Sequence, residues 1–294
     1  MTKFGFIAVV GEPNAGKSTL INQLVGQKVS IVSPKVQTTR QRVLGIAMAG
    51  EAQLVLIDTP GIFAPKKRLD RAMVATAWEA GREADQTILI VDASQKNQSR
   101  SQEILAGLEG RTVILVLNKV DAVDKGRLLK LAETYRKYEQ VSDIFMISAL
   151  TGDGVADLSS YIADKAPEGP WMFPEDDITD MPQRLWASEI TREQLYHQLH
   201  QELPYETFVE TEAWEEFDNG SVKINQVIYV NRDGQKSIIL GKRGSKIKEI
   251  SQAARTELSS LLGRQVHLYL YVKVAENWSE KSAFYRNMGL NFNA

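Results

Sequence analysis

The N-terminal segment of this chain places a glycine-rich loop directly after a short apolar run. Residues 4–10 are nearly all apolar, which is typical of a strand buried on both faces of a parallel sheet. Gly11 to Ser18 then match the P-loop pattern of glycine, four residues, glycine, lysine and serine or threonine. Residues 18–24 continue with a helix-compatible sequence. Strand, loop and helix in this order predict an α/β fold with a phosphate-binding site.

Each residue type in this loop suits a nucleoside polyphosphate. Glycines let several backbone N–H groups approach the phosphates, and the following helix presents its electropositive N-terminus. Lys17 supplies a positive charge for the β- and γ-phosphates, and the Ser18 hydroxyl suits Mg²⁺. The loop residues expected to contact the nucleotide are Gly11, Asn14, Ala15, Gly16, Lys17, Ser18 and Thr19.

Length and composition limit the class of protein. A chain of 294 residues exceeds the usual single-domain size, so we expect two domains. The absence of cysteine excludes disulfides and thiolate metal sites and fits a reducing cytosol. The apolar run before Gly11 is too short for a signal peptide core or a membrane span.

A second group of residues suited to binding Mg²⁺ and a γ-phosphate lies at the end of the next pair of strands. The polar stretch 29–42 lacks a clear period and predicts a loop that holds Gln-Thr-Thr-Arg at 37–40. Strands are expected at 43–48 and 53–58, joined by a hairpin, and the second ends in Asp58. An acid at the end of a buried strand, about forty residues after a P-loop, is where an Mg²⁺-linked aspartate is expected. Gly61 can bring its backbone N–H near a γ-phosphate.

The motif Asn118-Lys119-Val120-Asp121 follows the apolar strand 112–117 and identifies the base. The Asp121 carboxylate can accept hydrogen bonds from the ring N–H and the exocyclic amine of guanine, a donor pair that adenine does not present. Asn118 can reach the opposite edge of the base, and the stem of Lys119 can lie over the ring. The last strand, 144–147, ends in Ser148, Ala149 and Leu150, whose backbone can contact the guanine O6.

These elements predict a doubly wound α/β domain of about six strands and five helices in roughly 165 residues, including helices at 68–83, 99–108 and 155–165. The following stretch, 167–177, contains three prolines and four acids and marks a domain boundary, which Trp171 and Phe173 pin to a surface. We expect a nucleotide-binding domain over 1–167, a linker over 168–182 and a second, α+β domain over 183–294.

The sequence of the second domain predicts that it binds single-stranded RNA. We expect a helix over 183–202, strands at 207–217, 222–231 and 266–274, and a C-terminal helix over 281–288. The loop Gly-Lys-Arg-Gly at 241–244 stands between two helical segments, and such a turn lets an RNA backbone come close. The expected RNA contacts are Gly241, Lys242, Arg243, Gly244 and Lys246.

Charge is distributed unevenly along this half of the chain. Residues 222–274 carry a net charge of +7, and residues 168–221 carry −12. A basic segment of this kind suits a polyanion, although two solvated faces would give the same numbers. Tyr269 and Tyr271 alternate with apolar residues on one strand, and we favour packing over base stacking for them. The three histidines lack partners at metal-ligand spacing, so Mg²⁺ is the metal that the sequence suggests.

The motifs at 11–18, 38–39, 58–61, 118–121 and 148–150 resemble the five-motif set of translation-factor-class GTPases. The resemblance implies catalytic roles for Lys17, Thr39 and Gly61, and Mg²⁺ ligands from Ser18, Asp58 and Thr39, with Thr38 as the alternative to Thr39. Ile62 stands where Ras-like members carry the glutamine that orients water, which predicts slow unstimulated hydrolysis. Asn14 is similar to the asparagine of potassium-dependent members, which suggests K⁺.

Over its full length the chain resembles the bacterial Era GTPases, because a five-motif domain precedes a type II KH domain and the segments 171–176, 187–193 and 202–204 are similar to the interdomain sequence of that family. Thr191 and Glu12 depart from the family pattern. The resemblance implies a GTP-regulated monomer that binds 16S rRNA near its 3′ end and acts in 30S subunit assembly in the cytoplasm. It also implies peripheral association with the inner membrane.

Two alternatives are open at this level. One is an RNA-binding protein whose bound nucleotide is structural. The other is a membrane-associated signalling GTPase with secondary RNA affinity. The first predicts no multiple-turnover hydrolysis of GTP in the presence of ribosomal RNA, and the second predicts that RNA contacts are dispensable in cells.

Overall fold

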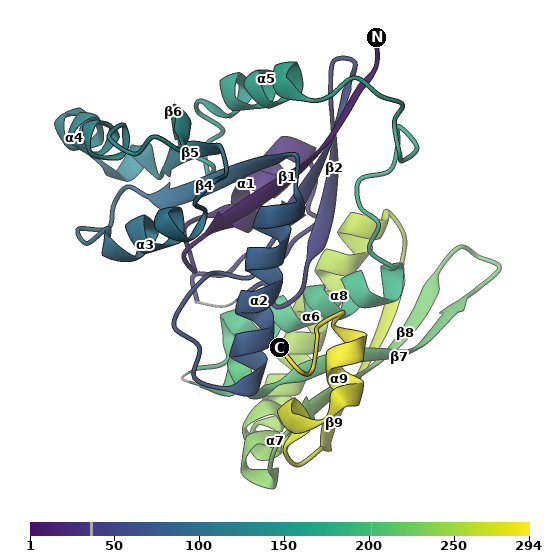
Figure 1. Ribbon diagram of the computed structural model, residues 1–294. Helices are drawn as coiled ribbons and strands as arrows, with labels where there is room; N and C mark the ends of the chain where they lie inside the picture. The colour runs from purple at the N-terminus through teal and green to yellow at the C-terminus, as the bar shows by residue number, and fades with distance from the viewer. Residues whose placement is uncertain (36–37, 201) are drawn as a thin grey trace. The chain divides into compact units, whose positions relative to one another are not determined.

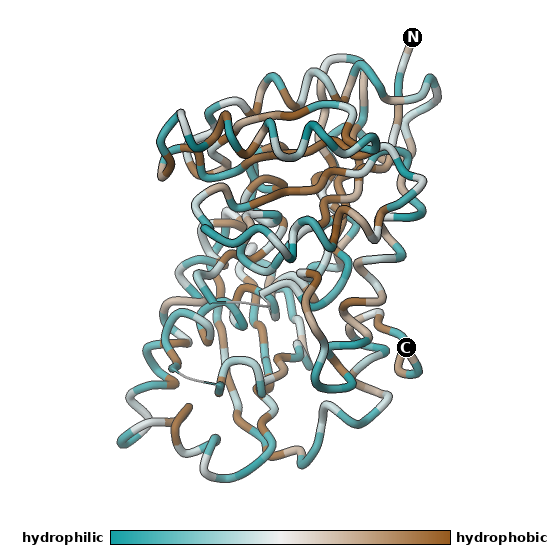
Figure 2. Tube along the Cα trace, turned by 60° about the vertical axis from the view of Figure 1, so that its left-hand side comes forward, coloured by the Kyte–Doolittle hydropathy of each residue, from teal (hydrophilic) through white to brown (hydrophobic). Residues whose placement is uncertain are grey.

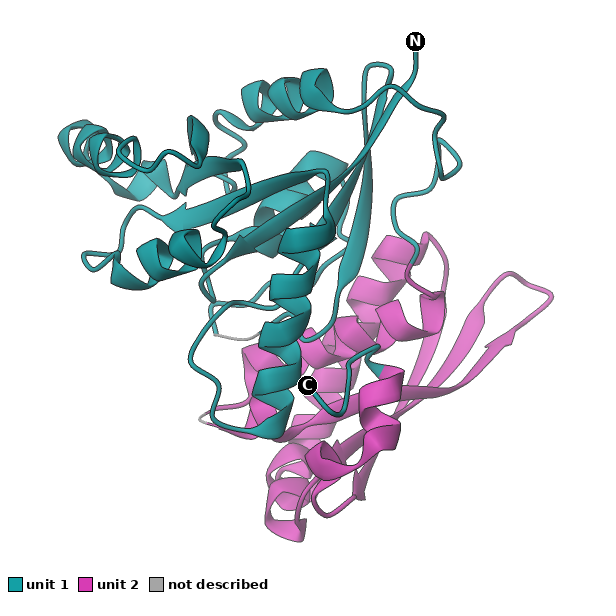
Figure 3. Ribbon diagram, viewed as in Figure 1, with its two compact units in different colours: residues 1–180, 288–294 teal, residues 181–287 magenta. Residues whose placement is uncertain are grey.

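The computed structural model describes residues 1–35, 38–200 and 202–294. These fall into two compact units, residues 1–180 with 288–294, and residues 181–287 (Figure 3). The first unit therefore takes in residues 168–180, which the sequence predicts as linker, and the last residues of the chain. The functional domain limits stay a prediction. Gln37 and Gln201, predicted in a loop and in a helix, lie outside the described residues.

The first unit is built on a six-stranded sheet with the order β2-β3-β1-β4-β5-β6 (Figure 1). The strands are β1 (Lys3–Gly11), β2 (Val43–Ala49), β3 (Ala52–Asp58), β4 (Gln86–Asp92), β5 (Val113–Asn118) and β6 (Val141–Ile147). β2 and β3 form the predicted antiparallel hairpin, and the other neighbours are parallel. The predicted α/β class is confirmed.

Helices cover both faces of this sheet, because its central strands are apolar on both sides. On β1, Ile7 and Val9 belong to one apolar cluster, and Ala8 and Val10 belong to another. The first cluster contains residues of α1 (Lys17–Val25) and α5 (Val155–Lys165). The second contains residues of α2 (Arg68–Glu83), α3 (Ser99–Gly107) and α4 (Lys125–Tyr135). Apolar residues follow the strands along the chain trace (Figure 2). The loops after the parallel strands therefore meet at one edge of a rigid sheet.

The segment after α5 is fastened to the first unit by a buried glutamine. Gln53, on β3, is fully buried. Its amide oxygen accepts hydrogen bonds from the backbone N–H groups of Met172 and Phe173 at 3.0 Å each, and its amide nitrogen donates to the Phe173 carbonyl at 2.8 Å. Trp171 donates from its indole to the Glu51 carbonyl at 3.0 Å. The predicted pinning of this segment to a surface is confirmed.

The second unit combines a three-stranded sheet with helices. Its elements are α6 (Gln183–Gln198), β7 (Phe208–Glu216), β8 (Val222–Val230), α7 (Asp233–Leu240), α8 (Ser245–Leu262), β9 (Val266–Val274) and α9 (Ser282–Asn287). The strand order is β7-β8-β9, with β7 antiparallel and β9 parallel to β8. The apolar cluster between this sheet and its helices includes Leu195, Val230, Ile239, Ile250 and Val272. The predicted order of helices and strands is confirmed.

Two expectations for the tail of this unit have different outcomes. Trp278 is buried, donates from its indole to the Glu206 carbonyl at 2.9 Å, and contacts Phe284 of α9, so it anchors the tail as predicted. The packing predicted for Tyr269 and Tyr271 is wrong, because these side chains remain 50% and 52% exposed.

Within the described ranges, no helix has the length and apolar character needed to cross a membrane.

Candidate functional site

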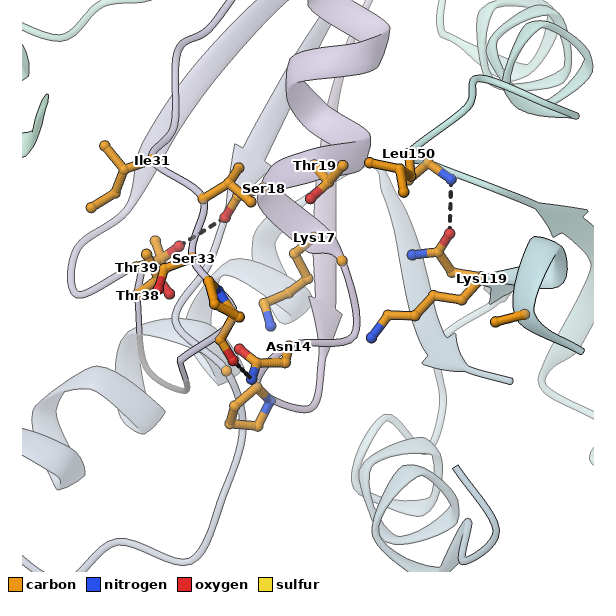
Figure 4. Close-up of a pocket in the computed structure, with 18 of the residues that line it drawn as sticks. Asn14, Lys17, Ser18, Thr19, Ile31, Ser33, Thr38, Thr39, Lys119 and Leu150 are labelled. Carbon is orange, nitrogen blue, oxygen red and sulfur yellow. Dashed lines mark hydrogen bonds between the residues drawn. The ribbon is translucent and has the colours of Figure 1, made fainter. Parts of the chain in front are cut away.

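A cavity of about 410 Å³ lies where the loops after β1, β3, β5 and β6 meet. Its walls contain many of the residues predicted to bind a nucleotide, and Figure 4 shows Lys17, Ser18, Thr39 and Lys119 around it. The predicted residues that line it are Asn14, Gly16, Lys17, Ser18, Thr19, Thr38, Thr39, Gly61, Asn118, Lys119, Asp121, Ala149 and Leu150. The fully buried Ala15 and Asp58 and the nearly buried Ser148 support this wall from behind.

Lys17 lies at the base of the cavity and is nearly buried. Its Nζ donates to the Glu12 carbonyl at 2.8 Å and to the Gly11 carbonyl at 3.3 Å. Burial lowers the pKa of Lys17 to about 8, against smaller upward effects of Asp58 and Glu12. A bound phosphate would stabilise the protonated form of this amine, so the cavity is preorganised for an anion. The Glu12 carboxylate points elsewhere and hydrogen-bonds to Ser101 on α3.

Three oxygen-bearing side chains converge beside Lys17. Ser18 Oγ donates to Asp58 Oδ2 at 2.7 Å, and Thr39 Oγ1 lies 2.9 Å from Ser18 Oγ and 3.1 Å from Asp58 Oδ2. Thr38 instead donates to the Lys35 carbonyl at 3.0 Å, so the geometry favours Thr39 over Thr38 as a metal ligand. Burial raises the pKa of Asp58, while the hydrogen bonds and Lys17 lower it.

This oxygen cluster fits Mg²⁺. Asp58 Oδ1 is buried, and no described residue donates a hydrogen bond to it. An orphaned carboxylate oxygen next to two hydroxyls suits a hard cation that completes its coordination shell with phosphate oxygens and waters. The described part of the chain contains no group of three or more His, Cys, Asp or Glu side chains that could hold a metal ion.

The segment after Asp58 packs directly on the P-loop. Gly61 lies so close to Pro13 that a Cβ atom at this position would come within 2.7 Å of it. The neighbouring Ile62 donates its backbone N–H to the Gly11 carbonyl at 3.0 Å. The Ile62 side chain is 5% exposed and belongs to an apolar cluster of the first unit, so it faces away from the cavity. The Ile62 side chain therefore cannot orient water, as the sequence predicts.

Asn118 connects the P-loop with the loop after β6. Its Nδ2 donates to the Ala15 carbonyl at 2.8 Å, and its Oδ1 accepts from the Ala149 N–H at 2.9 Å. Through these two bonds the buried Asn118 side chain holds two walls of the cavity in place. The bond to Ala15 uses one of the two N–H groups of Nδ2, so the contact with the base that the sequence predicts for Asn118 stays a prediction. Asp121 is exposed on the cavity wall, and its contact with guanine stays a prediction.

Asp92 is a site residue that sequence reasoning missed. It ends β4, and its Oδ2 accepts from Lys119 Nζ at 2.6 Å. Burial alone would raise the pKa of Asp92, but bonds from Lys119 and Ser94 lower it below its usual value. This ion pair holds the side chain of Lys119, whose backbone has a left-handed conformation (φ 65°). The sequence could have indicated this residue, because an acid at the C-terminal end of a strand lies where α/β sheets bind ligands.

Changing Asp92 to asparagine is expected to weaken GDP binding about 5-fold, since a partly exposed charged hydrogen bond contributes about 1 kcal/mol. A titration with fluorescent GDP measures this. The preference for guanine over other bases should stay the same, because Asp121 is unchanged. A loss of that preference would contradict a purely positioning role for Asp92.

The glycine-bracketed loop of the second unit joins α7 to α8. Gly241 (φ 70°), Arg243 (φ 53°) and Gly244 (φ 79°) have left-handed conformations, and the Gly244 N–H donates to the Gly241 carbonyl at 3.2 Å. Lys242 and Arg243 are exposed. The loop turns directly into the N-terminus of α8, which favours an anion such as phosphate.

The surroundings of this loop are partly apolar and partly charged. Leu240, Ile247 and Leu270 are only partly buried, and they extend the apolar core toward the surface. The loop also borders a cavity of about 690 Å³. Lys246 lines this cavity but is paired with Glu249 at 2.6 Å, so Lys242 and Arg243 are the more accessible cations for RNA.

The P-loop, the oxygen cluster and Asp121 define a GTP-binding protein of the P-loop class, and the second unit has the helices, three-stranded sheet and Gly-Lys-Arg-Gly loop of a KH domain. Residues 6–119 match the family described as 50S ribosome-binding GTPase, and residues 202–279 match the KH domain family.

Comparison with whole proteins gives the particular family. The chain is 54% identical to GTPase Era of Brucella suis and 55% identical to that of Rhizobium meliloti, over 99% of this chain and 94% of each relative. The solved structure of Era in complex with MgGDPNP and nucleotides 1506–1542 of 16S ribosomal RNA matches with a TM-score of 0.92 and 40% identity, over 98% of this chain and 99% of that one. An Aquifex aeolicus Era variant bound to GDP and AlF4⁻ matches with a TM-score of 0.91, also at 40% identity and over the same shares. The chain belongs to the Era family of GTPases.

Proposed function

We propose that this protein is a GTP-dependent switch that binds 16S rRNA near its 3′ end through the KH domain and acts in assembly of the 30S subunit. The observation that carries the proposal is the presence of two sites in one chain: a cavity whose wall carries Asp121, the carboxylate predicted to select guanine, and a Gly-Lys-Arg-Gly loop with two exposed basic residues. The likeness to Era in complex with a 16S rRNA segment supports this choice of RNA.

The nucleotide site would work as a switch through the segments that contact the γ-phosphate. Lys17 would neutralise the β- and γ-phosphates. Ser18, Thr39 and Asp58 would hold Mg²⁺, which would supply positive charge to the phosphates during hydrolysis. Thr39 and Gly61 lie on the two loops that would sense the γ-phosphate and release it after hydrolysis. Because Ile62 cannot orient water, we expect slow intrinsic hydrolysis that a partner or a bound cation stimulates.

Potassium is the cation that we propose for this stimulation. Asn14 Nδ2 donates to the Pro34 carbonyl at 2.8 Å, so an amide and a carbonyl group lie together at the edge of the cavity. Oxygen atoms of this kind suit a hard monovalent ion. Hydrolysis should be about 10-fold faster in KCl than in NaCl, and the substitution Asn14→Ala should abolish this difference. Equal rates in the two salts would disprove the proposal.

The proposed function is tested by crosslinking and sequencing of RNA bound to the protein in the presence of a GTP analogue or GDP. We expect crosslinks at the 3′ end of 16S rRNA, and more of them with the GTP analogue. Crosslinks elsewhere on ribosomal RNA would reject the RNA target, and equal yields in both states would reject the switch.

We further propose that the protein acts as a monomer in the cytoplasm and associates peripherally with the inner membrane.

A further inference from the structure

The sheet of the second unit has a face opposite to α6, α7 and α8, which we name the outer sheet face. Along β9, Leu268 and Val272 are buried, while His267, Tyr269, Tyr271 and Lys273 alternate with them and point to the outer side. The strand register places Lys223, Asn225, Val227 and Tyr229 of β8 beside these four residues. On β7 the corresponding positions are Glu215, Ala213, Glu210 and Phe208, and the neighbouring Glu212 also reaches this face through its ion pair with Lys273.

One end of the outer sheet face is covered within the unit and Val227 in its middle is buried, whereas the two tyrosines along β9 are exposed. Phe208 and Tyr229 pack against Phe284, and Phe208 also contacts Trp278, so α9 and its preceding turn cover that end. Toward the other end, Tyr269 and Tyr271 are 50% and 52% exposed. Residues two apart on a strand are about 7 Å apart, so the two rings form a short aromatic ladder. Exposed aromatic rings with polar tips are typical of interaction surfaces.

The charged side chains on the outer sheet face determine what kind of partner it can bind. Both lysines are already paired, Lys223 with Glu215 at 3.2 Å and Lys273 with Glu212 at 2.8 Å. Glu210 accepts a hydrogen bond from the neutral amide of Asn287 at 3.1 Å. The pKa of Tyr229 is raised to about 12, by burial first and by Glu210 and Glu212 in addition.

The three glutamates of this face, Glu210, Glu212 and Glu215, outnumber its two lysines, and this acidic excess disfavours an RNA backbone. Arginine suits the face better, because its guanidinium stacks on tyrosine rings and binds carboxylates through two parallel hydrogen bonds. The surface ion pairs of Lys223 and Lys273 are weak enough for arginine to displace the lysines.

We propose that the outer sheet face binds an extended, arginine-rich segment of a partner protein. Guanidinium groups of this segment stack on Tyr269 and Tyr271, and its charges pair with Glu210 and Glu212. An extended chain has the same two-residue period as β9, so alternate arginines meet both rings. The surface is separate from the Gly-Lys-Arg-Gly loop, so the partner segment and RNA bind to different elements of the unit.

Fluorescence anisotropy on the full chain tests the proposal, with a labelled peptide of alternating arginine and serine as the probe. The double variant Tyr269→Ser/Tyr271→Ser should weaken peptide binding about 10-fold, the sum of two cation–π contacts. Glu210→Gln/Glu212→Gln should weaken binding and reduce its dependence on salt. The matched control is Glu109→Gln/Glu139→Gln, which removes the same charge from exposed positions of the first unit and should leave affinity unchanged. A lysine–serine peptide should bind more weakly than the arginine peptide.

Three results would overturn the proposal. One is unchanged peptide affinity in the tyrosine variant with an unchanged thermal unfolding midpoint. Another is a loss of affinity for a 16S 3′-end oligonucleotide in that variant without loss of peptide binding, which would make the face an RNA platform. The last is self-association of the wild-type chain in sedimentation experiments that the tyrosine substitutions remove, which would assign the face to a second copy.

Discussion

Replacing Asp121 by asparagine is expected to lower the affinity for GDP about 100-fold and to create affinity for xanthine nucleotides. The carboxylate can accept from two N–H groups of guanine, whereas asparagine loses the charge and one of the two acceptor oxygens. This loss costs about 3 kcal/mol, which corresponds to the expected factor. An asparagine amide offers an N–H donor where xanthine carries an oxygen. Asp121 is exposed on the cavity wall, so the substitution should not disturb packing.

Competition titrations with GDP, XDP and ADP against a fluorescent nucleotide measure the change. The control is Asp92→Asn, which removes the same charge beside Lys119 but leaves the contact proposed for the base intact. That variant should bind GDP somewhat more weakly and keep its preference for guanine. An unchanged ratio of guanine to xanthine affinity in Asp121→Asn would remove Asp121 from the base-recognition site.

Gly244→Asp should weaken binding of a 16S 3′-end oligonucleotide by about 10- to 100-fold while leaving GDP affinity unchanged. A carboxylate in the loop would repel phosphate at the place where the N-terminus of α8 attracts it. Gly244 has a left-handed backbone with φ 79°, but no atom lies within 4 Å of the position that a Cβ would take, so the side chain itself has room. Gly241 is less suitable, because a Cβ there would come within 2.9 Å of the Lys246 backbone nitrogen.

Gly263→Asp is the matched control for this experiment. Gly263 also has a left-handed backbone, with φ 62°, and equally open space, but it follows the C-terminus of α8. Both variants add one charge and similar backbone strain, so a difference in RNA affinity reports on the loop. Equal loss in the two variants would show that strain, and not the loop, causes the effect. Full function of Gly244→Asp in cells would favour the membrane-signalling alternative.

The strands and the phosphate loop could be predicted well because local patterns determine them. The central strands of the first unit are continuous apolar runs, since both faces are buried, and α2 and α5 have the predicted bounds. No helix was predicted at α4, whose surface is mostly polar and which buries mainly Leu128 and Tyr135. The N-cap of α4, Asp124, accepts from the Arg127 N–H and was the missed indication.

Contacts between distant segments could not be predicted in the same way. The bridging role of Asn118 depends on the positions of Ala15 and Ala149, which only the folded sheet brings together. The choice between Thr38 and Thr39 likewise depends on which hydroxyl the loop turns toward Asp58. For Tyr269 and Tyr271, alternation shows that they share a strand face but does not show what covers that face.

The hydrogen bonds of Gln53 to the segment after α5 limit the length of the connection between the two units. The Ile46 N–H also donates to the Ile178 carbonyl at 2.8 Å, and α6 begins only five residues further along the chain. The chain connects the units a second time, because residues 288–294, which follow α9, belong to the first unit. Two short connections keep the effective concentration of one site at the other high, in the millimolar range typical of short linkers. We expect that lengthening the connection before α6 weakens the communication between nucleotide and RNA without altering either site.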